Sequence, residues 1–149
     1  MKTTMWRRAA VGIATAVLLS AGAVTVAAPA TAAVELTWDF LGEDSNFYYI
    51  ELYLNGGLAG EVGFSKDADD GVPGNAMMAL DDTSDGWAVK AELIVGSTTK
   101  SVTTQGHNAI YSTGWKVQSG LIEGRTYSLK GCVIGGSTTM CTPPDTVTA

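Results

Sequence analysis

The sequence predicts a single antiparallel β-sandwich of about seven to nine strands, with a β-barrel as the alternative arrangement. Three observations favour this class. Short runs that alternate apolar and polar residues recur along the chain, turn residues separate these runs, and no stretch after residue 32 has the apolar periodicity of a long amphipathic helix. Regularly spaced strands with turn residues between them are typical of all-β domains.

The first two predicted strands show the alternation most clearly. In 34–42, VELTWDFLG, the even-numbered residues from Val34 to Phe40 are apolar and the residues between them are polar. In 47–55, FYYIELYLN, the even-numbered residues form one apolar face, which we expect to face the core. Further β-prone runs, bounded by turn residues, are 60–65, 76–82, 86–96, 98–104, 109–117, 126–134 and 138–142.

The N-terminal residues 1–32 predict a secretory signal peptide. Three basic residues precede the uncharged run 9–28, and the small residues 30–33 follow it as an A-x-A-like cleavage site. A retained membrane anchor is the alternative, because the run is almost long enough to span a bilayer. However, no basic stop-transfer cluster follows it. We therefore expect a secreted, extracellular domain, residues 33–149, with no membrane association after cleavage.

The charge of this domain limits its partners. The chain has 9 Lys/Arg and 15 Asp/Glu, and three of the basic residues lie in the signal peptide, which leaves 6 against 15, a net charge of −9. An acidic surface repels phosphate backbones and anionic lipids. Nucleic acid and membrane surfaces are therefore poor partners, whereas an extracellular protein or a glycan fits this charge. The sequence does not indicate an oligomeric state.

The segment 80–93, LDDTSDGWAVKAEL, falls close to the residue spacing of an EF-hand calcium loop. The last ligand of such a loop returns to the metal because a helix begins inside the loop. Here the residues after Gly86 alternate as in a strand, so Glu92 would lie roughly 23 Å from Asp85 at about 3.3 Å per residue. We expect a hairpin turn instead, with Gly86 at positive φ and an aspartate bonded to local backbone.

A weaker calcium site stays open at the same turn. Asp81, Asp82 and Asp85, together with the aspartates of 67–70, would hold Ca²⁺ loosely, at the millimolar affinity of many extracellular sites. Calcium is the one cofactor that the sequence suggests, since it contains no phosphate loop, no dinucleotide fingerprint and no His-rich zinc spacing.

Both cysteines, Cys132 and Cys141, lie in the secreted part, where an isolated pair is typical of a disulfide. The segment 127–142, YSLKGCVIGGSTTMCT, predicts a hairpin. If Gly136–Ser137 is its two-residue turn, the cysteines lie opposite each other at a Cα separation of roughly 4.5–5.5 Å, which a disulfide accepts. The rival interpretation, a two-cysteine metal site, lacks further ligands, because the chain has one histidine.

The segment 120–136, GLIEGRTYSLKGCVIGG, resembles the tyrosine-corner strand of fibronectin type III domains. Leu121, Gly124 and Tyr127 match its L-x-P-G-x-x-Y spacing, with Glu123 in place of the proline. The resemblance implies an immunoglobulin-like or fibronectin III-like sandwich, in which the Tyr127 hydroxyl bonds to nearby backbone where the chain crosses between sheets. An ordinary strand tyrosine is the alternative. The whole chain also resembles the small exported β-proteins of high-GC Gram-positive bacteria, a likeness that implies no activity.

Aromatic residues mark the candidate binding site. Phe47, Tyr49 and Tyr53 lie on the second face of their strand, opposite its apolar face. Neighbouring aromatic side chains on an exposed sheet face can stack on sugar rings or anchor a protein partner. The alternative is a central strand that is buried on both faces, or a strand whose aromatic side chains cover a loop. We expect Trp87 and Trp115 to belong to the core, because each lies on the apolar side of its strand.

The sequence does not indicate an enzyme, and we assign no catalytic residue. His107 lies beside glycine and asparagine in a segment typical of a loop, and no G-x-S-x-G nucleophile elbow occurs. Three functions stay open. The first is a non-enzymatic binding or interaction domain for a protein or a cell-wall glycan. The second is a calcium-stabilised structural protein. The third is a small hydrolase or a hydrolase inhibitor, and an inhibitor would present the turn-rich loop 67–75.

Overall fold

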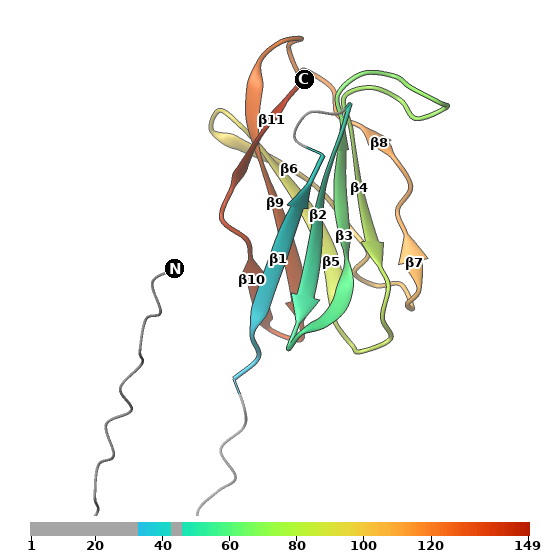
Figure 1. Cartoon of the computed structure of the whole chain (residues 1–149), viewed down its shortest axis with the longest axis vertical. Coiled ribbons are helices and arrows are strands. Elements are labelled where there is room, and N and C mark those ends of the chain that lie inside the picture. Colours follow the sequence, from blue (N-terminus) through green and yellow to red (C-terminus); the bar gives the residue numbers. More distant parts are fainter. Residues whose placement is uncertain (1–32, 43–45) are drawn as a thin grey trace, which may run out of the picture. The chain divides into compact units, whose positions relative to one another are not determined.

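The protein is a two-layer β-sandwich in the computed structural model, which describes residues 33–42 and 46–149 (Figure 1). Residues Ala33–Ala149 form one compact unit. The predicted signal peptide, 1–32, lies outside the described residues. Among the residues that are described, no helix is long and apolar enough to cross a membrane.

All strand pairs in the two sheets are antiparallel. The first sheet has the order β1-β2-β3-β4-β7, and β8 also pairs with β4. Its strands are β1 (Leu36–Leu41), β2 (Phe47–Leu54), β3 (Gly57–Ser65), β4 (Ala76–Asp81), β7 (Tyr111–Ser112) and β8 (Lys116–Val117). The second sheet has the order β10-β9-β5-β6, and β11 also pairs with β9. Its strands are β5 (Ala88–Val95), β6 (Thr98–Thr103), β9 (Thr126–Gly135), β10 (Thr138–Cys141) and β11 (Asp145–Thr148). The predicted sandwich is confirmed, and the described residues form eleven strands where seven to nine were predicted.

The core lies between the two sheets and comes from alternate residues of their strands. In β2 the apolar face predicted from the sequence is buried, with Leu52 fully inaccessible. The sheets approach closely at Gly131 of β9, where a Cβ atom would lie 2.9 Å from a methyl carbon of Leu52. Trp87 packs against the core, as predicted. The largest fully buried apolar side chains are Phe64, Ile50, Leu52, Met77, Leu93 and Leu129.

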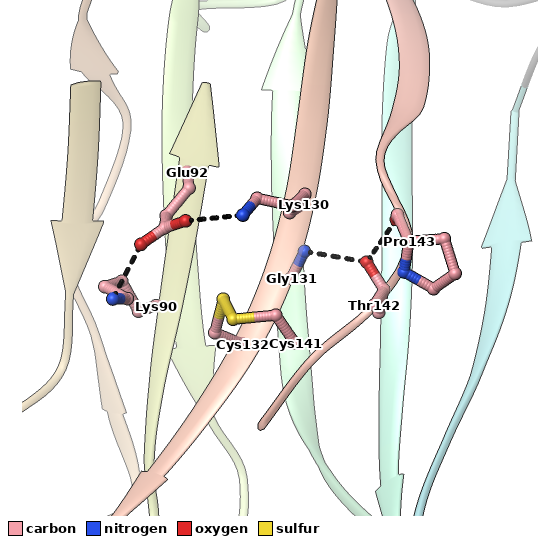
Figure 2. The surroundings of a disulfide bond; sticks show 8 residues. All are labelled: Lys90, Glu92, Lys130, Gly131, Cys132, Cys141, Thr142 and Pro143. Atoms are coloured by element: carbon pink, nitrogen blue, oxygen red, sulfur yellow. Dashed lines mark hydrogen bonds and ion pairs between the residues drawn. A yellow bond between two sulfur atoms is a disulfide. The ribbon is translucent and has the colours of Figure 1, made fainter. Parts of the chain in front are cut away.

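The β9–β10 hairpin matches its prediction. Thr138 pairs with Gly135, so Gly136–Ser137 is the turn, and Cys132 pairs with Cys141. The two cysteines form a disulfide (Figure 2), and their Cα atoms lie 4.0 Å apart, slightly closer than predicted. The disulfide therefore joins directly opposed residues of one hairpin.

On the outer face of the second sheet, Glu92 lies between two lysines (Figure 2). Its carboxylate oxygens lie 2.7 Å from Nζ of Lys90 and 3.1 Å from Nζ of Lys130. The hydrogen bond from Lys90, with the one from Lys130, holds the pKa of Glu92 below its ordinary value. Glu92 is thus part of a strand-to-strand ion pair, and the chain has no EF-hand at this segment.

The segment between β4 and β5 connects the two sheets, so the predicted hairpin is wrong. Its predicted local geometry is nevertheless present. Gly86 has a φ of 84°. Asp81 accepts a hydrogen bond from the backbone N–H of Thr83 at 3.2 Å, and Asp85 accepts one from the N–H of Trp87 at 2.8 Å. These hydrogen bonds form in a hairpin turn and in a connection between sheets alike, because they do not depend on which sheet the next strand joins.

Two further elements differ from the prediction. The run 109–117 is not one strand but the two short strands β7 and β8, which both pair with β4. Gly114, between them, has a φ of 60° and bends the chain. The strand β11 was not predicted, because it follows a pair of prolines, Pro143 and Pro144. It pairs with β9 and buries Val147 in the core.

Tyr127 lies where the chain passes from β8 in the first sheet to β9 in the second. Its hydroxyl oxygen accepts a hydrogen bond from the backbone N–H of Ile122 at 2.8 Å. The bond that the tyrosine-corner spacing implied is therefore present.

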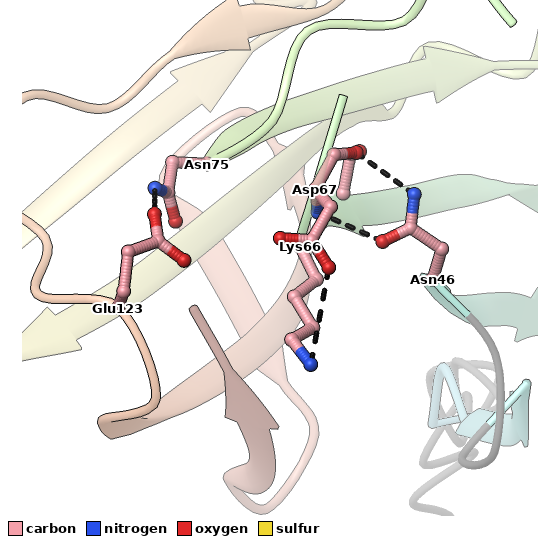
Figure 3. A network of polar contacts seen from close by, with 6 residues as sticks. Asn46, Lys66, Asp67, Asn75 and Glu123 are labelled. Carbon is pink, nitrogen blue, oxygen red and sulfur yellow. Dashed lines mark hydrogen bonds and ion pairs between the residues drawn. The ribbon is translucent and has the colours of Figure 1, made fainter. Parts of the chain in front are cut away.

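Side-chain amides bind the base of the β3–β4 loop (Figure 3). The amide of Asn46 makes two hydrogen bonds to the backbone of Asp67, both 2.8 Å long. At the other end of the loop, Nδ2 of Asn75 donates to Glu123 at 2.7 Å. Residues 68–71, at the tip, are exposed. The loop is thus held at both ends and open to solvent between them.

Candidate functional site

The outer face of the first sheet, turned away from the core, carries the three predicted aromatic residues. Successive side chains of a strand point to opposite faces. Because the even-numbered residues of β2 fill the core, Phe47, Tyr49 and Tyr53 lie on the outer face, where each is partly exposed. The strand is therefore not buried on both faces.

A fourth aromatic residue joins this face from a distant part of the chain. Trp115 lies between β7 and β8, and its ring centroid is 5.9 Å from that of Phe47 and 6.2 Å from that of Tyr49. The Phe47 and Tyr49 rings lie 6.3 Å apart. These are distances at which aromatic rings attract each other. We call Phe47, Tyr49 and Trp115 the aromatic cluster. The prediction that Trp115 belongs to the core is wrong, since it is partly exposed on the outer face.

A glycine in β3 lets the aromatic cluster lie against the sheet. Gly63 pairs with Tyr49 on one side and with Met78 on the other. A Cβ atom at Gly63 would lie 2.9 Å from Cη2 of Trp115 and 3.0 Å from both Cγ of Met78 and Cε1 of Tyr49. Glycine within a strand marks such close approaches. Any larger residue at position 63 would therefore displace the rings.

Next to the aromatic cluster, three carboxylates form a line across three strands. Asp39 of β1 pairs with Glu51 of β2, and Glu51 pairs with Glu61 of β3. We call these residues the carboxylate row. In the described part of the chain, every ion pair is made by a carboxylate other than these three. Like charges directly opposite each other in a sheet are destabilising. The row therefore concentrates negative charge that no lysine or arginine of the described residues pairs with.

The electrostatics of the row follow from this arrangement. Burial raises the pKa of Glu61, and repulsion from Glu51 and Asp82 raises it further. Tyr53 donates a hydrogen bond of 2.5 Å to Glu51, and this bond raises the pKa of the Tyr53 hydroxyl. Tyr53 is thus connected to the carboxylate row, whereas Phe47 and Tyr49 belong to the aromatic cluster.

The structure places two of the three predicted aromatic residues in one cluster and the third apart from it. Trp115, which was not predicted as a site residue, joins the first two. Phe47 and Tyr49 lie together, and Tyr53 lies on the same face beside Glu51. Trp115 was missed because the run 109–117 alternates like a single strand. Gly114, directly before the tryptophan, is the signal that marked a bend there.

The candidate calcium ligands do not converge. Among the described residues, the carboxylates of Asp81, Asp82 and Asp85 are not part of a group of three ligands with all atoms within 4.8 Å. The group that meets this criterion is Glu92 with Cys132 and Cys141. Both of these sulfur atoms form the disulfide and are not available as thiolate ligands.

His107, which was predicted to lie in a loop, lies exposed in the β6–β7 loop. Its ring stacks on that of Tyr111, with the centroids 3.8 Å apart and the planes 4° from parallel. The loop position agrees with the prediction.

No family model matches this chain, and no curated protein or solved structure matches it either.

Proposed function

We propose that this protein is a secreted, non-enzymatic binding domain, and that it binds an extracellular protein through the outer face of the first sheet. The observation that carries the proposal is the position of the aromatic cluster beside the carboxylate row on one solvent-facing surface. Rigid aromatic side chains supply much of the binding energy in protein interfaces. The row supplies hydrogen-bond acceptors and negative charge.

The charge of the row favours a basic partner. Asp39, Glu51 and Glu61 repel one another, so a lysine or arginine that enters between them relieves the repulsion. The same side chain can make a cation–π contact with the neighbouring Tyr49 or Trp115. The proposed partner segment therefore carries a basic and an apolar side chain two residues apart, because residues two apart in an extended peptide lie on the same face. A cell-wall glycan is the alternative ligand, with its sugar rings on the aromatic cluster.

Two labelled peptides test this function. One is extended, with lysine and leucine in turn at every second position and serine between them, so that both face the same side, and the other has glutamine in place of each lysine. We expect the basic peptide to bind, to lose affinity as salt screens the charges, and to bind more tightly than its neutral partner. Equal affinities for the two peptides, or no binding of either, would contradict the proposal. Binding of neutral oligosaccharides that is lost in Trp115→Ala would assign the face to a glycan.

Charge variants locate the binding surface. We expect Glu51→Gln and Glu61→Gln each to weaken binding of the basic peptide. Glu92→Gln is the matched control, because it makes the same charge change on the outer face of the other sheet. Equal losses in all three variants would mean that only the net charge of the protein matters.

A second candidate function, inhibition of a hydrolase, is favoured by the β3–β4 loop. Inhibitors bind with little change in backbone structure, so their binding loops are held in place before binding. Here Asn46 and Asn75 hold the base of the loop and leave its tip exposed. To test this function, the present protein is added to secreted proteases and glycosidases, and the enzyme activity that remains is measured. Inhibition that is lost in Asn46→Ala would support this function, and full activity of every enzyme would exclude it.

A further inference from the structure

A cavity of about 400 Å³ lies at one end of the sandwich. It forms where the β4–β5 connection, the β6–β7 loop and the β9–β10 turn meet, at the end drawn lowest in Figure 1. Its size is within the range of about 300–1,000 Å³ that is typical of small-molecule sites. The segment that resembles a calcium loop forms much of its wall, through Asp81, Thr83, Ser84, Gly86 and Trp87. None of its lining residues belongs to the aromatic cluster or the carboxylate row.

A buried carboxylate lines this cavity. Asp81 ends β4 in the same alternation as Met77 and Ala79, which lie in the core, and its side chain is only 4% exposed. Oδ1 of Asp81 accepts the hydrogen bond from Thr83, and in the described part of the chain no ion pair involves this carboxylate. Burial raises the pKa of Asp81, and repulsion from nearby aspartates adds to the effect of burial. A donor from a ligand would offset the cost of burying this group.

Two rings supply flat surfaces at the same cavity. The indole of Trp87 lies over Gly135, where a Cβ atom would be 2.6 Å from Cδ2 of the ring, so the indole is held in place by backbone and core. His107 lines the cavity as well, and its stacking on Tyr111 orients the imidazole. Rings held in place in this way offer surfaces to a ligand at little cost in conformational entropy.

The polar groups of the cavity select the chemistry of its ligand. Asp81 accepts hydrogen bonds, whereas the amides of Gln105 and Asn108 both donate and accept them. Among the described residues that line the cavity there is no lysine or arginine, so an anionic ligand would meet no opposite charge. An ammonium ligand uses acceptors alone, so it would bond to Asp81 but not to the exposed amide N–H groups of Gln105 and Asn108. Hydroxyl groups use donors and acceptors together.

We propose that this cavity binds a neutral sugar, with the sugar ring against Trp87 and its hydroxyl groups bonded to Asp81 and to the amides of Gln105 and Asn108. A flat indole beside polar groups that donate and accept hydrogen bonds matches a pyranose, which has apolar C–H faces and a rim of hydroxyls. This site does not depend on the proposed protein partner, since it lies at the end of the sandwich and uses other residues.

Nuclear magnetic resonance titration with defined sugars tests the proposal. The probes are the methyl glycosides of glucose, galactose and mannose, and N-acetylglucosamine, at millimolar concentrations. We expect at least one of them to cause saturable shifts of the Trp87 indole N–H and of the His107 and Asn108 amides, and no shifts at Tyr49 or Trp115. Absence of shifts with all four sugars would overturn the proposal. Larger shifts of Trp87 with tetramethylammonium than with any sugar would also overturn it.

Amino-acid variants distinguish the loss of a sugar contact from a change in the fold. Asn108→Ala removes an exposed side chain and should weaken sugar binding about fivefold, which corresponds to one hydrogen bond of about 1 kcal/mol. Asp81→Asn keeps an acceptor for Thr83 and should also weaken binding. If Asp81→Asn fails to fold, Asn108→Ala still decides the question. Thr99→Ala, at an exposed position of β6, is the control and should bind as the wild type does. Unchanged affinity in Asn108→Ala would contradict the assigned contacts.

Discussion

Trp115 lies on Gly63, and a Cβ atom at position 63 would be 2.9 Å from the end of the indole ring. The two residues come from distant parts of the chain, β3 and the β7–β8 connection. Their contact determines the candidate site, because it brings Trp115 to the rings of Phe47 and Tyr49. The aromatic cluster therefore depends on the absence of a side chain at Gly63 as well as on the rings themselves.

Gly63→Ala should displace Trp115 while the fold is kept. The added methyl group contacts side-chain atoms of Trp115, Tyr49 and Met78 rather than backbone, and its strain is partly offset by the lower entropy of the unfolded chain. We therefore expect the free energy of unfolding to fall by no more than about 2 kcal/mol. Binding of the basic peptide should weaken. Nuclear Overhauser contacts between Trp115 and Tyr49 measure the displacement, and unchanged contacts together with unchanged binding would contradict it.

Glu61→Gln should stabilise the protein at neutral pH. The pKa of Glu61 is raised by burial and by Glu51 and Asp82. Its stabilising contribution is therefore complete below the pKa of the unfolded chain, near 4.5, and is lost as the pH rises through the higher folded value. A like-charge pair directly opposite in a sheet costs about 0.2–1 kcal/mol.

Urea unfolding at several pH values measures this effect. The glutamine variant should be more stable than the wild type at pH 7, and the difference should shrink toward acidic pH as Glu61 becomes protonated. Equal stability of the two proteins across this range would show that the carboxylate row costs nothing. A gain in stability with a loss of peptide binding in the same variant would show that this carboxylate is kept for binding.

Removal of the disulfide should destabilise the domain. The bridge between Cys132 and Cys141 closes a loop with a sequence separation of 9 residues. On the chain-entropy model such a short loop contributes about 2.5–3 kcal/mol. The Cys132→Ser, Cys141→Ser double variant should lose about this amount in guanidinium unfolding. Thiol titration of the denatured wild type checks the premise, and two free thiols would contradict it.

Calcium should leave the stability unchanged. The carboxylates of Asp81, Asp82 and Asp85 do not converge within the described residues, and two of them already bond to backbone N–H groups. We expect the same thermal midpoint with millimolar calcium and with a chelator. A midpoint that rises with calcium and falls with chelator would instead support the calcium-stabilised structural protein, and magnesium is the control for general ionic effects.

Local alternation was enough to predict most of the individual strands. In β2 the spacing of apolar residues identified the core face, because a period of two leaves only one way to bury Ile50, Leu52 and Leu54 together. The β9–β10 hairpin was predictable for the same reason, and its two-residue turn placed Cys132 opposite Cys141. These features depend on residues that are near in sequence.

Features that depend on distant partners were not predictable. Alternation continues through the segment between β4 and β5, so it cannot distinguish a hairpin from a crossover between sheets. The position of Trp115 depends on Gly63 in another strand and on the bend at Gly114. The strand β11 was not predicted, because its sequence is short and follows two prolines. Its pairing with β9 identifies it as a strand. The end cavity forms where three connections meet, and no pattern within one segment of the sequence indicates that they do.

The most direct test of the account is the stability and the binding of the Tyr49→Ala, Trp115→Ala double variant, measured side by side. If these rings form a binding surface, the free energy of unfolding should fall by less than about 1 kcal/mol, and binding of the basic peptide should be lost. Ile50→Ala, on the core side of the same strand, is the control and should lose about 2–5 kcal/mol. A loss of that size in the double variant, or peptide binding equal to that of the wild type, would contradict the central claim.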